Sequence, residues 1–222
     1  MTATISFTFD DGRASHVSLG SKILDEFGLK GTFYVCPGLV KQERYGWKPK
    51  DTTYELASWS EIEDACRRGH EIGNHSWSHS VFPEIVRGKS DAEVAEMADN
   101  EITEAAMLLD RNLGQERFSW AWPCHGIEPR VQRWIDEHHV GVRPKRPRGP
   151  YGAKRSREKS LKDTNAFVDL LIAEGIWGVP TIHDLGEGDG KYSDYVFRKH
   201  LEYVLSKKEI RVRTVAEVLS EA

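Results

Sequence analysis

Two carboxylates stand side by side near the start of the chain, directly before a glycine. Asp10, Asp11 and Gly12 follow an alternation of apolar and polar residues over 5–9, which predicts a strand that ends in a turn. Successive side chains on a regular strand point to opposite faces, so adjacent aspartates can serve one site only where the strand breaks. They then reach that site from different directions, and this asymmetry predicts two distinct roles.

Imidazoles gather about sixty residues later, in the segment 69–79, which reads GHEIGNHSWSH. His75 and His79 are four residues apart, which places them on one face if the segment forms a helical turn. A catalytic zinc site typically takes three protein ligands and leaves one position for water. Two histidines and one aspartate supply such a set, and the other aspartate can accept a proton from the attacking water.

A late segment, 180–184, supplies a further imidazole. It reads PTIHD and places His183 at the end of another predicted strand. Departure of a leaving group needs an acid, and a histidine is of the right type. The next residue, Asp184, can have a different role, which is to orient an imidazole.

Strands and helices are expected to alternate about seven times. The expected strands cover 5–9, 31–35, 71–74, 118–122, 140–143, 176–183 and 210–212, and the expected helices cover 16–27, 59–68, 91–109, 129–138, 165–173, 195–205 and the residues from 215 on. This alternation favours parallel strands with helices outside, in either a closed barrel or a doubly wound open sheet. In a barrel, functional groups gather at the C-terminal strand ends. The residues expected there are Asp10, Asp11, His75, Pro123, Cys124 and His183.

Composition sets further limits. The chain has 222 residues, 39% of them hydrophobic, which favours one domain over residues 1–222 with one sizeable core. A formal net charge of −4 gives no global field for nucleic acid or an anionic membrane surface. No apolar run approaches the roughly 20 residues that span a bilayer. We therefore expect a cytoplasmic protein from the sequence as written, or a secreted one if an export signal has been removed. Its three cysteines are widely spaced and are expected to be reduced.

The motifs at 8–12 (TFDDG), 69–79 and 182–184 (IHD) resemble those of the polysaccharide deacetylase family, also called the NodB-homology or carbohydrate esterase family 4 domain. The resemblance extends from Ile5 to about Val218. It implies an α/β fold, a distorted barrel of the (β/α)7 type. It also implies metal-dependent removal of acetyl groups from N- or O-acetylated carbohydrate by attack of a metal-bound water.

The same resemblance assigns roles to the matched residues. Asp10 would be the base, Asp11, His75 and His79 the metal ligands, and His183 the acid. Zinc is the usual ion, with cobalt, nickel or manganese as alternatives. The implied partner is an acetylated oligo- or polysaccharide, with no nucleic acid or membrane partner, and the oligomeric state is left open.

The stretch 120–126 (WAWPCHG) departs from the family's third motif. It keeps the proline and glycine, so the amide of Cys124 can still face a developing oxyanion. It lacks the arginine that holds the base, and Arg143, at the end of the next predicted strand, is the candidate replacement. The aspartate and tryptophan of the fourth motif are also missing after Arg143, where the chain is basic.

Substrate contacts are expected from Trp77, Trp122, Pro123, Cys124 and Arg143. Indole rings stack on sugars, although most tryptophans pack in cores. The small side chain of Cys124 leaves room for substrate, and no base is spaced to make it a nucleophile.

Two features near this predicted pocket are open to more than one interpretation. His125, beside the supposed oxyanion amide, is a second acid, an extra ligand or neither. The basic stretch 144–159 is either a solvated loop or a flap that recognises a negatively charged glycan or a partner.

Two other functions fit the altered motifs. One is a hydrolase of another amide, such as a formyl or cyclic amide, with altered metal dependence. The other is a non-catalytic glycan-binding relative that has kept the fold. The intact Asp10 and His183 argue against the second, because loss of activity usually erases the acid and base first.

Overall fold

The computed structural model describes residues 2–40, 55–115, 118–151, 157–183, 185–186 and 192–221. Asp184, residues 41–54 and residues 152–156 of the basic stretch lie outside these ranges. All statements below concern the described part of the chain.

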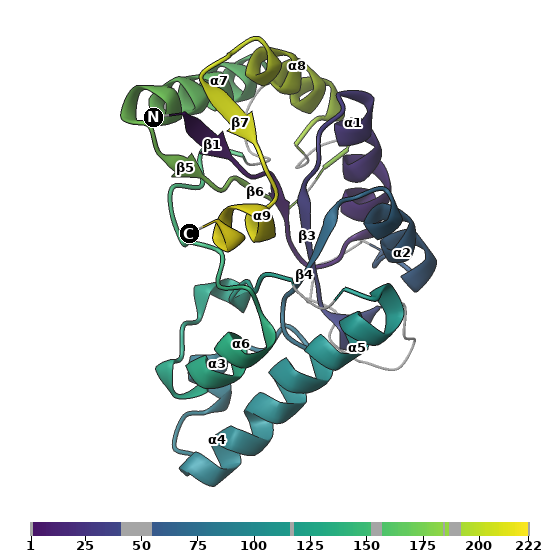
Figure 1. Ribbon diagram of the computed structural model, residues 1–222, viewed down its shortest axis with the longest axis vertical. Coiled ribbons are helices and arrows are strands. Elements are labelled where there is room, and N and C mark those ends of the chain that lie inside the picture. The colour runs from purple at the N-terminus through teal and green to yellow at the C-terminus, as the bar shows by residue number, and fades with distance from the viewer. Residues whose placement is uncertain are drawn as a thin grey trace.

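Parallel strands form the centre of the molecule (Figure 1). One sheet has the order β5-β1-β7 and the other the order β4-β3-β2-β6, and every pair of these strands is parallel, as the alternation predicted. The strands are β1 (Ala3–Ile5), β2 (Thr8–Phe9), β3 (Thr32–Val35), β4 (Glu71–Asn74), β5 (Trp177–Gly178), β6 (Thr181–Ile182) and β7 (Ile210–Val212). The predicted strands 71–74 and 210–212 are confirmed in full.

The predicted strands 5–9 and 176–183 are each broken in two. β1 and β2 belong to different sheets, and so do β5 and β6, yet β1 pairs with β5 and β2 with β6. The two sheets are therefore continuous along these chain segments and form two parts of one bent β-sheet layer. Ser6 and Thr8 bridge the break by donating backbone N–H groups to Gly178 and Pro180.

The strands predicted at 118–122 and 140–143 are corrected to isolated bridges. Trp120 pairs in parallel with Asn74 and with Val142, which continues the sheet beyond β4. Pro123 and Pro144 follow within three residues, and a proline has no N–H to extend a ladder. Each pairing is consequently limited to a single residue.

Helices surround the strands. They are α1 (Ser21–Glu26), α2 (Trp59–Arg67), α3 (Phe82–Ile85), α4 (Asp91–Ala98), α5 (Glu104–Leu113), α6 (Gln132–His138), α7 (Arg157–Glu174), α8 (Asp194–Leu205) and α9 (Val215–Ser220). Short π or 3-10 segments are η1 (Ser15–Gly20), η2 (Pro37–Leu39), η3 (Asp99–Thr103), η4 (Pro123–His125) and η5 (Pro129–Val131). Figure 1 shows α7, α8, α1 and α2 around the outside of the strands, with α3, α4 and α6 at the lower end.

Capping signals explain several helix limits. Ser58 and Ser90 each form a capping box with a glutamate three residues on, so both predicted N-termini are confirmed. Gly114 closes α5 in the left-handed conformation. α7 begins eight residues before the predicted start at 165, so that prediction was too short.

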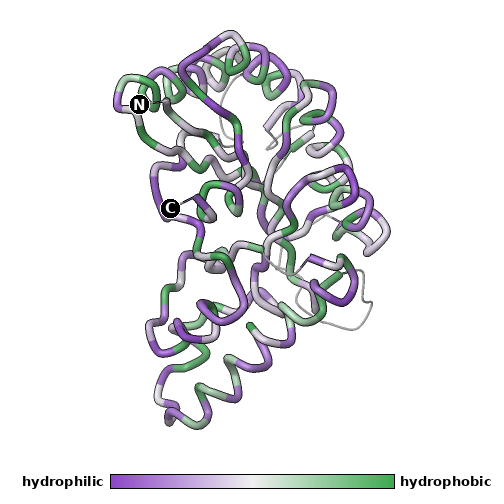
Figure 2. Tube along the Cα trace, in the orientation of Figure 1, coloured by the Kyte–Doolittle hydropathy of each residue, from purple (hydrophilic) through white to green (hydrophobic). Residues whose placement is uncertain are grey.

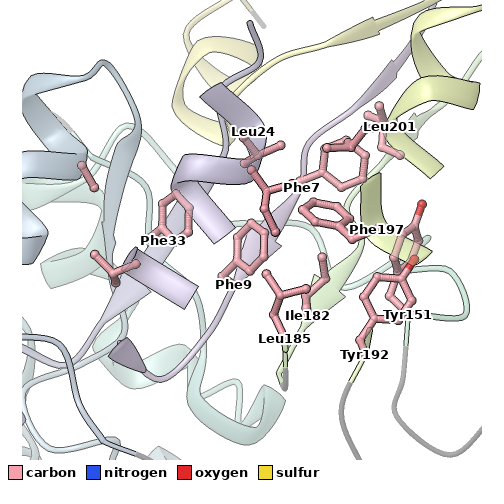
Figure 3. Packing of buried hydrophobic residues seen from close by; sticks show 14 of the residues in the cluster. Phe7, Phe9, Leu24, Phe33, Tyr151, Ile182, Leu185, Tyr192, Phe197 and Leu201 are labelled. Atoms are coloured by element: carbon pink, nitrogen blue, oxygen red, sulfur yellow. The ribbon is translucent and has the colours of Figure 1, made fainter. Parts of the chain in front are cut away.

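Two apolar clusters hold the elements together. In the main cluster, Phe9 stacks on Phe33 at 4.7 Å between ring centres, and Phe7 meets Phe197 edge-on at 5.5 Å (Figure 3). The second cluster joins α3, α4 and α6 to Trp120 and Trp122. Figure 2 shows hydrophobic and hydrophilic residues interspersed along the outer helices, as expected for helices with one buried face. None of the described helices is long and apolar enough to cross a bilayer.

Strand register determines which residues meet at the C-terminal edge. Phe9 pairs with Ile182, so the residues that follow, Asp10 and His183, leave the sheet side by side. Val35 pairs with Asn74, which places His75 one residue beyond the same edge.

Candidate metal centre

Asp11, His75 and His79 form a group that can hold a metal ion. One ligand atom from each lies within 4.8 Å of the others. Asp11 Oδ1 is 3.3 Å from Nε2 of His79 and 3.8 Å from Nε2 of His75. Two imidazoles and a carboxylate are a donor set that suits zinc and similar divalent ions, so the residues fit the implied metal.

Left-handed backbone brings these ligands together. Asp11 has φ +72° and Gly12 has φ +62°, and the N–H of Gly12 donates to the carbonyl of Tyr34. Residues 75–79 are not helical, so the helical turn that the spacing of the two histidines allowed does not form. The chain turns instead at Ser76 (φ +66°) and His79 (φ +62°).

His75 is fixed in one tautomer. Its Nδ1 donates to the carbonyl of Ala121 at 2.8 Å, which leaves the lone pair of Nε2 facing Asp11. Burial lowers the pKa of His75 to about 4, although the charges of Asp10 and Asp11 oppose this effect. The ring is therefore neutral at pH 7, the form that binds a metal.

Arg13 holds the other oxygen of Asp11. Its Nη2 and Nε lie 2.8 and 3.3 Å from Oδ2, while Oδ1 faces the histidines. Burial raises the pKa of Asp11, but a hydrogen bond with His79 and the charges of His75 and His79 outweigh it and hold the pKa well below its usual range. The sequence hypothesis did not include Arg13; its signal is an arginine two residues after the carboxylate.

Asp10 is buried and paired with Arg143. Nη1 and Nη2 of Arg143 lie 2.5 and 2.8 Å from the two carboxylate oxygens. Nη1 also donates to Thr8 Oγ1 at 3.0 Å, and the guanidinium lies 4.6 Å from the ring centre of Tyr34. Burial raises the pKa of Asp10, but the charge and hydrogen bonds of Arg143 outweigh it, so the carboxyl stays ionised.

Asp10 lies between the ligand group and His183. Its Oδ2 is 4.0 Å from Nε2 of His75 and 3.8 Å from Nε2 of His183. The side chain of His183 is half exposed, unlike that of Asp10. The late histidine thus borders the site from the solvent side, where a substrate can reach it.

The stretch 122–126 borders the same region. Pro123 begins η4, and Cys124 and His125 follow with φ +47° and +57°. Cys124 is exposed, and partial burial together with nearby carboxylates raises the pKa of its thiol, so the thiol stays protonated at pH 7. This state does not favour a nucleophile.

The two tryptophans proposed as substrate contacts differ in setting. Trp122 is buried against Phe82 and Trp120, yet part of it lines a pocket of about 240 Å³ that Arg143 also lines. Trp77 is half-buried and lies on Gly38, where a Cβ would come within 2.3 Å of the indole nitrogen.

His125 is not part of the ligand group within the described residues. It instead receives a hydrogen bond from Arg148, a contact that the sequence hypothesis did not include. Burial and the charges of Arg148 and Arg143 lower the pKa of His125 to about 4, so the ring is neutral at pH 7.

Comparison with solved structures finds proteins with a similar fold. The chitin deacetylase of the fungal pathogen Colletotrichum lindemuthianum is 16% identical, with a TM-score of 0.65 over 100% of this chain and 89% of that one. The family 4 carbohydrate esterase of Streptomyces lividans, solved with acetate, is 13% identical, with a TM-score of 0.62 over 95% of this chain and 91% of that one. The Xyl-CE4 domain of a xylanase from the hindgut metagenome of Trinervitermes trinervoides is 16% identical, with a TM-score of 0.61 over 100% and 91%.

These likenesses confirm the fold class as an α/β, distorted (β/α)7 barrel. No curated protein sequence matches the chain. The polysaccharide deacetylase family model matches residues 2–140, which is more than half of the sequence. The chain therefore belongs to the polysaccharide deacetylase family.

Proposed function

We propose that the protein is a metal-dependent hydrolase that removes acetyl groups from N- or O-acetylated carbohydrate. The observation that carries this proposal is the position of Asp10, paired with Arg143 and next to the group of Asp11, His75 and His79. When bound there, a divalent ion polarises the acyl carbonyl and lowers the pKa of water. Zinc is the proposed ion, because two imidazoles and one carboxylate suit it.

Asp10 is proposed to take the proton of the attacking water. Its carboxylate is ionised and is held in one direction by the two donors of Arg143, so it needs no reorganisation before it accepts a proton. Burial of the pair keeps bulk water from competing for the carboxylate oxygens.

His183 is proposed to protonate the leaving amine or alcohol. It lies 3.8 Å from Asp10, on the exposed side of the site. The reacting carbonyl of a bound substrate can therefore face Asp10 while the leaving group faces His183. The N–H of Cys124, in a left-handed turn after Pro123, is the proposed oxyanion donor.

The glycan-binding alternative rested on the arginine missing from 120–126. Arg143 makes the contact to Asp10 from another part of the chain, so the loss from that stretch leaves no unpaired base. The geometry favours an enzyme over a binding module.

The test is acetate release from a panel of acetylated oligosaccharides, before and after removal of metal with a chelator. Asp10→Asn should retain the ion and lose turnover, whereas His75→Ala should lose the ion. Arg211→Gln, a substitution on the exposed face of β7, is the control for non-specific effects of substitution and purification. Full activity after complete metal removal, or full activity of Asp10→Asn, would overturn the proposal.

A further inference from the structure

A cationic pocket opens beside the proposed base. Its volume is about 240 Å³, and Arg143, whose guanidinium binds Asp10, forms part of its wall. The other lining residues include Trp122, His125, Ile127, Pro144, Lys145 and Arg148. The pocket lining therefore combines apolar and basic side chains, and through Arg143 it adjoins the reacting region.

Two of these cations have no acidic partner among the residues that the structure describes. Within the described ranges, no carboxylate lies at ion-pair distance from Lys145 or Arg148, whereas Arg143 is neutralised by Asp10. His125 adds no charge to the pocket, since its ring is neutral at pH 7. The pocket thus carries a surplus of positive charge in a protein whose formal net charge is −4.

The positive charges repel one another. Burial and the charge of Arg143 lower the pKa of Arg148, while Asp10 opposes this. Placing the half-buried Arg148 near the buried Arg143 costs free energy that a bound anion would recover. An anionic ligand is the natural complement to such a group.

The basic segment is anchored to the barrel. The carbonyl of Pro147 accepts a hydrogen bond from the N–H of Val179, between β5 and β6, at 2.8 Å. Gly149 (φ +64°) packs so closely on Phe167 that a Cβ would come within 2.7 Å of its ring. The hydroxyl of buried Tyr151 lies 2.6 Å from Nε2 of His200. In the described part, residues 147–151 are fixed against the sheet and do not form a solvated loop.

Arg148 is oriented by His125. One N–H of its guanidinium donates to Nε2 of the neutral imidazole. Of the five donors that an arginine carries, the others have no partner among the described residues and are left for a ligand. A planar guanidinium fork matches the paired oxygens of a carboxylate, phosphate or sulfate group.

We propose that this pocket binds an anionic substituent of the acetylated sugar substrate, with Arg148 and Lys145 on the charged group and Trp122 and Ile127 against the carbon skeleton. The proposal rests on the proposed deacetylase function and names its substrate class. The volume fits one substituent or one ring and not a polymer surface, which favours a substrate group over a macromolecular partner.

The kinetic test uses matched substrates: N-acetylglucosamine oligomers without charge, and the same oligomers bearing a 6-phosphate, a 6-sulfate or a uronic carboxylate. We expect a lower KM for at least one charged member, and a KM that rises with ionic strength. Arg148→Gln and Lys145→Gln should shrink the ratio of neutral to charged KM about ten- to hundred-fold, as loss of a charge-assisted hydrogen bond predicts. Arg211→Gln should leave the ratio unchanged. An equal effect on all members, or no preference for any anion, would overturn the proposal.

A binding test separates this inference from the deacetylase proposal. Calorimetry on the Asp10→Asn protein measures N-acetylglucosamine, its 6-phosphate, its 6-sulfate and inorganic phosphate alone. Binding of a charged sugar that depends on Arg148, together with no acetate release by the parent protein from any substrate, would retain the anion site and reject the deacetylase. Acetate release by the parent protein without a preference for charged substrates would retain the deacetylase proposal and reject the anion site. Equal affinity for inorganic phosphate and the sugar phosphate would reject the sugar-specific pocket.

Discussion

Arg143 and Asp10 form a two-point ion pair inside the barrel. Nη1 meets Oδ1 at 2.5 Å and Nη2 meets Oδ2 at 2.8 Å, although the residues are 133 positions apart in sequence. Both side chains are almost fully buried. Two parallel charge-assisted hydrogen bonds fix the plane of the carboxylate as well as its charge. The direction of Asp10 toward His183 and the ligand group is thus determined by a residue that is distant in sequence and lines the pocket.

Arg143→Lys should raise the pKa of Asp10 and loosen its orientation without removing the positive charge beside it. An ammonium offers no planar fork, so the carboxylate loses one of two fixed hydrogen bonds and its pKa rises. We expect kcat/KM at pH 7 to fall about ten- to hundred-fold, because the carboxylate is no longer held in one orientation. Acetate release measured at pH 7 checks this.

Arg211→Lys, the same change on the exposed face of β7, is the matched control. Thermal unfolding of both variants guards against a simple loss of fold, because weakening a buried pair also destabilises. An unchanged kcat/KM in a folded Arg143→Lys protein would show that Arg143 does not position the base.

His79→Ala should reduce metal affinity by at least about 100-fold, because a three-ligand site becomes a two-ligand site. His183→Ala is the matched control, since that histidine also lies near Asp10 but outside the ligand group. Competition for Zn²⁺ with a chromophoric chelator measures both affinities without any activity assay. Equal affinities in the two variants would contradict the ligand assignment.

Much of the site could be predicted because the residue pattern of the sequence indicates where strands end. Alternating residues up to Phe9 and the glycine at 12 place Asp10 and Asp11 at a C-terminal edge, and parallel register brings His75 and His183 to the same edge. Arg143 could be proposed only as a candidate. No local pattern tells which distant strand end faces which carboxylate, since that depends on the tertiary wrapping of the barrel.

Other features depend on contacts that local patterns do not encode. The left-handed Ser76 and His79 replace the expected helical turn, and their conformations are held by neighbours such as the Asn74 side chain, which accepts from the N–H of Ser76. The pairing of His125 with Arg148 joins two loops. The single-residue bridges at Trp120 and Val142 are a further example. The residue pattern of each segment indicates a strand, but the proline that follows it shortens the pairing.

Arg13→Gln should lower metal affinity about ten- to hundred-fold, as loss of a residue that orients a ligand typically does. Arg13 binds Oδ2 of Asp11 and so keeps Oδ1 toward the histidines. Saturating Zn²⁺ should restore most of the activity, because the ligands themselves remain. The chelator competition measures the affinity, and a rate that stays low at saturating metal would point to a direct role of Arg13 in turnover.

Buried His200 should make the fold less stable in acid. Its burial lowers its pKa to about 3 from an ordinary value near 6.5. Between these two values the unfolded chain binds a proton that the folded protein excludes, so stability is full above pH 6.5 and falls as pH drops toward 3. This group alone adds a slope of up to about 1.4 kcal/mol per pH unit. Urea unfolding from pH 7 to 4.5 measures the slope.

His200→Gln should reduce that slope, whatever its effect on stability at pH 7. Tyr151→Phe is the control: it removes the hydroxyl that lies 2.6 Å from Nε2 of His200 but keeps the buried imidazole. It should lower the free energy of unfolding by about 1–3 kcal/mol across the range, the cost of an unsatisfied buried group, with the slope retained. His16, His70 and His139 also have pKa values near 4, so some slope should survive in both variants. An identical slope in His200→Gln and the parent protein would mean that His200 is protonated in the folded state.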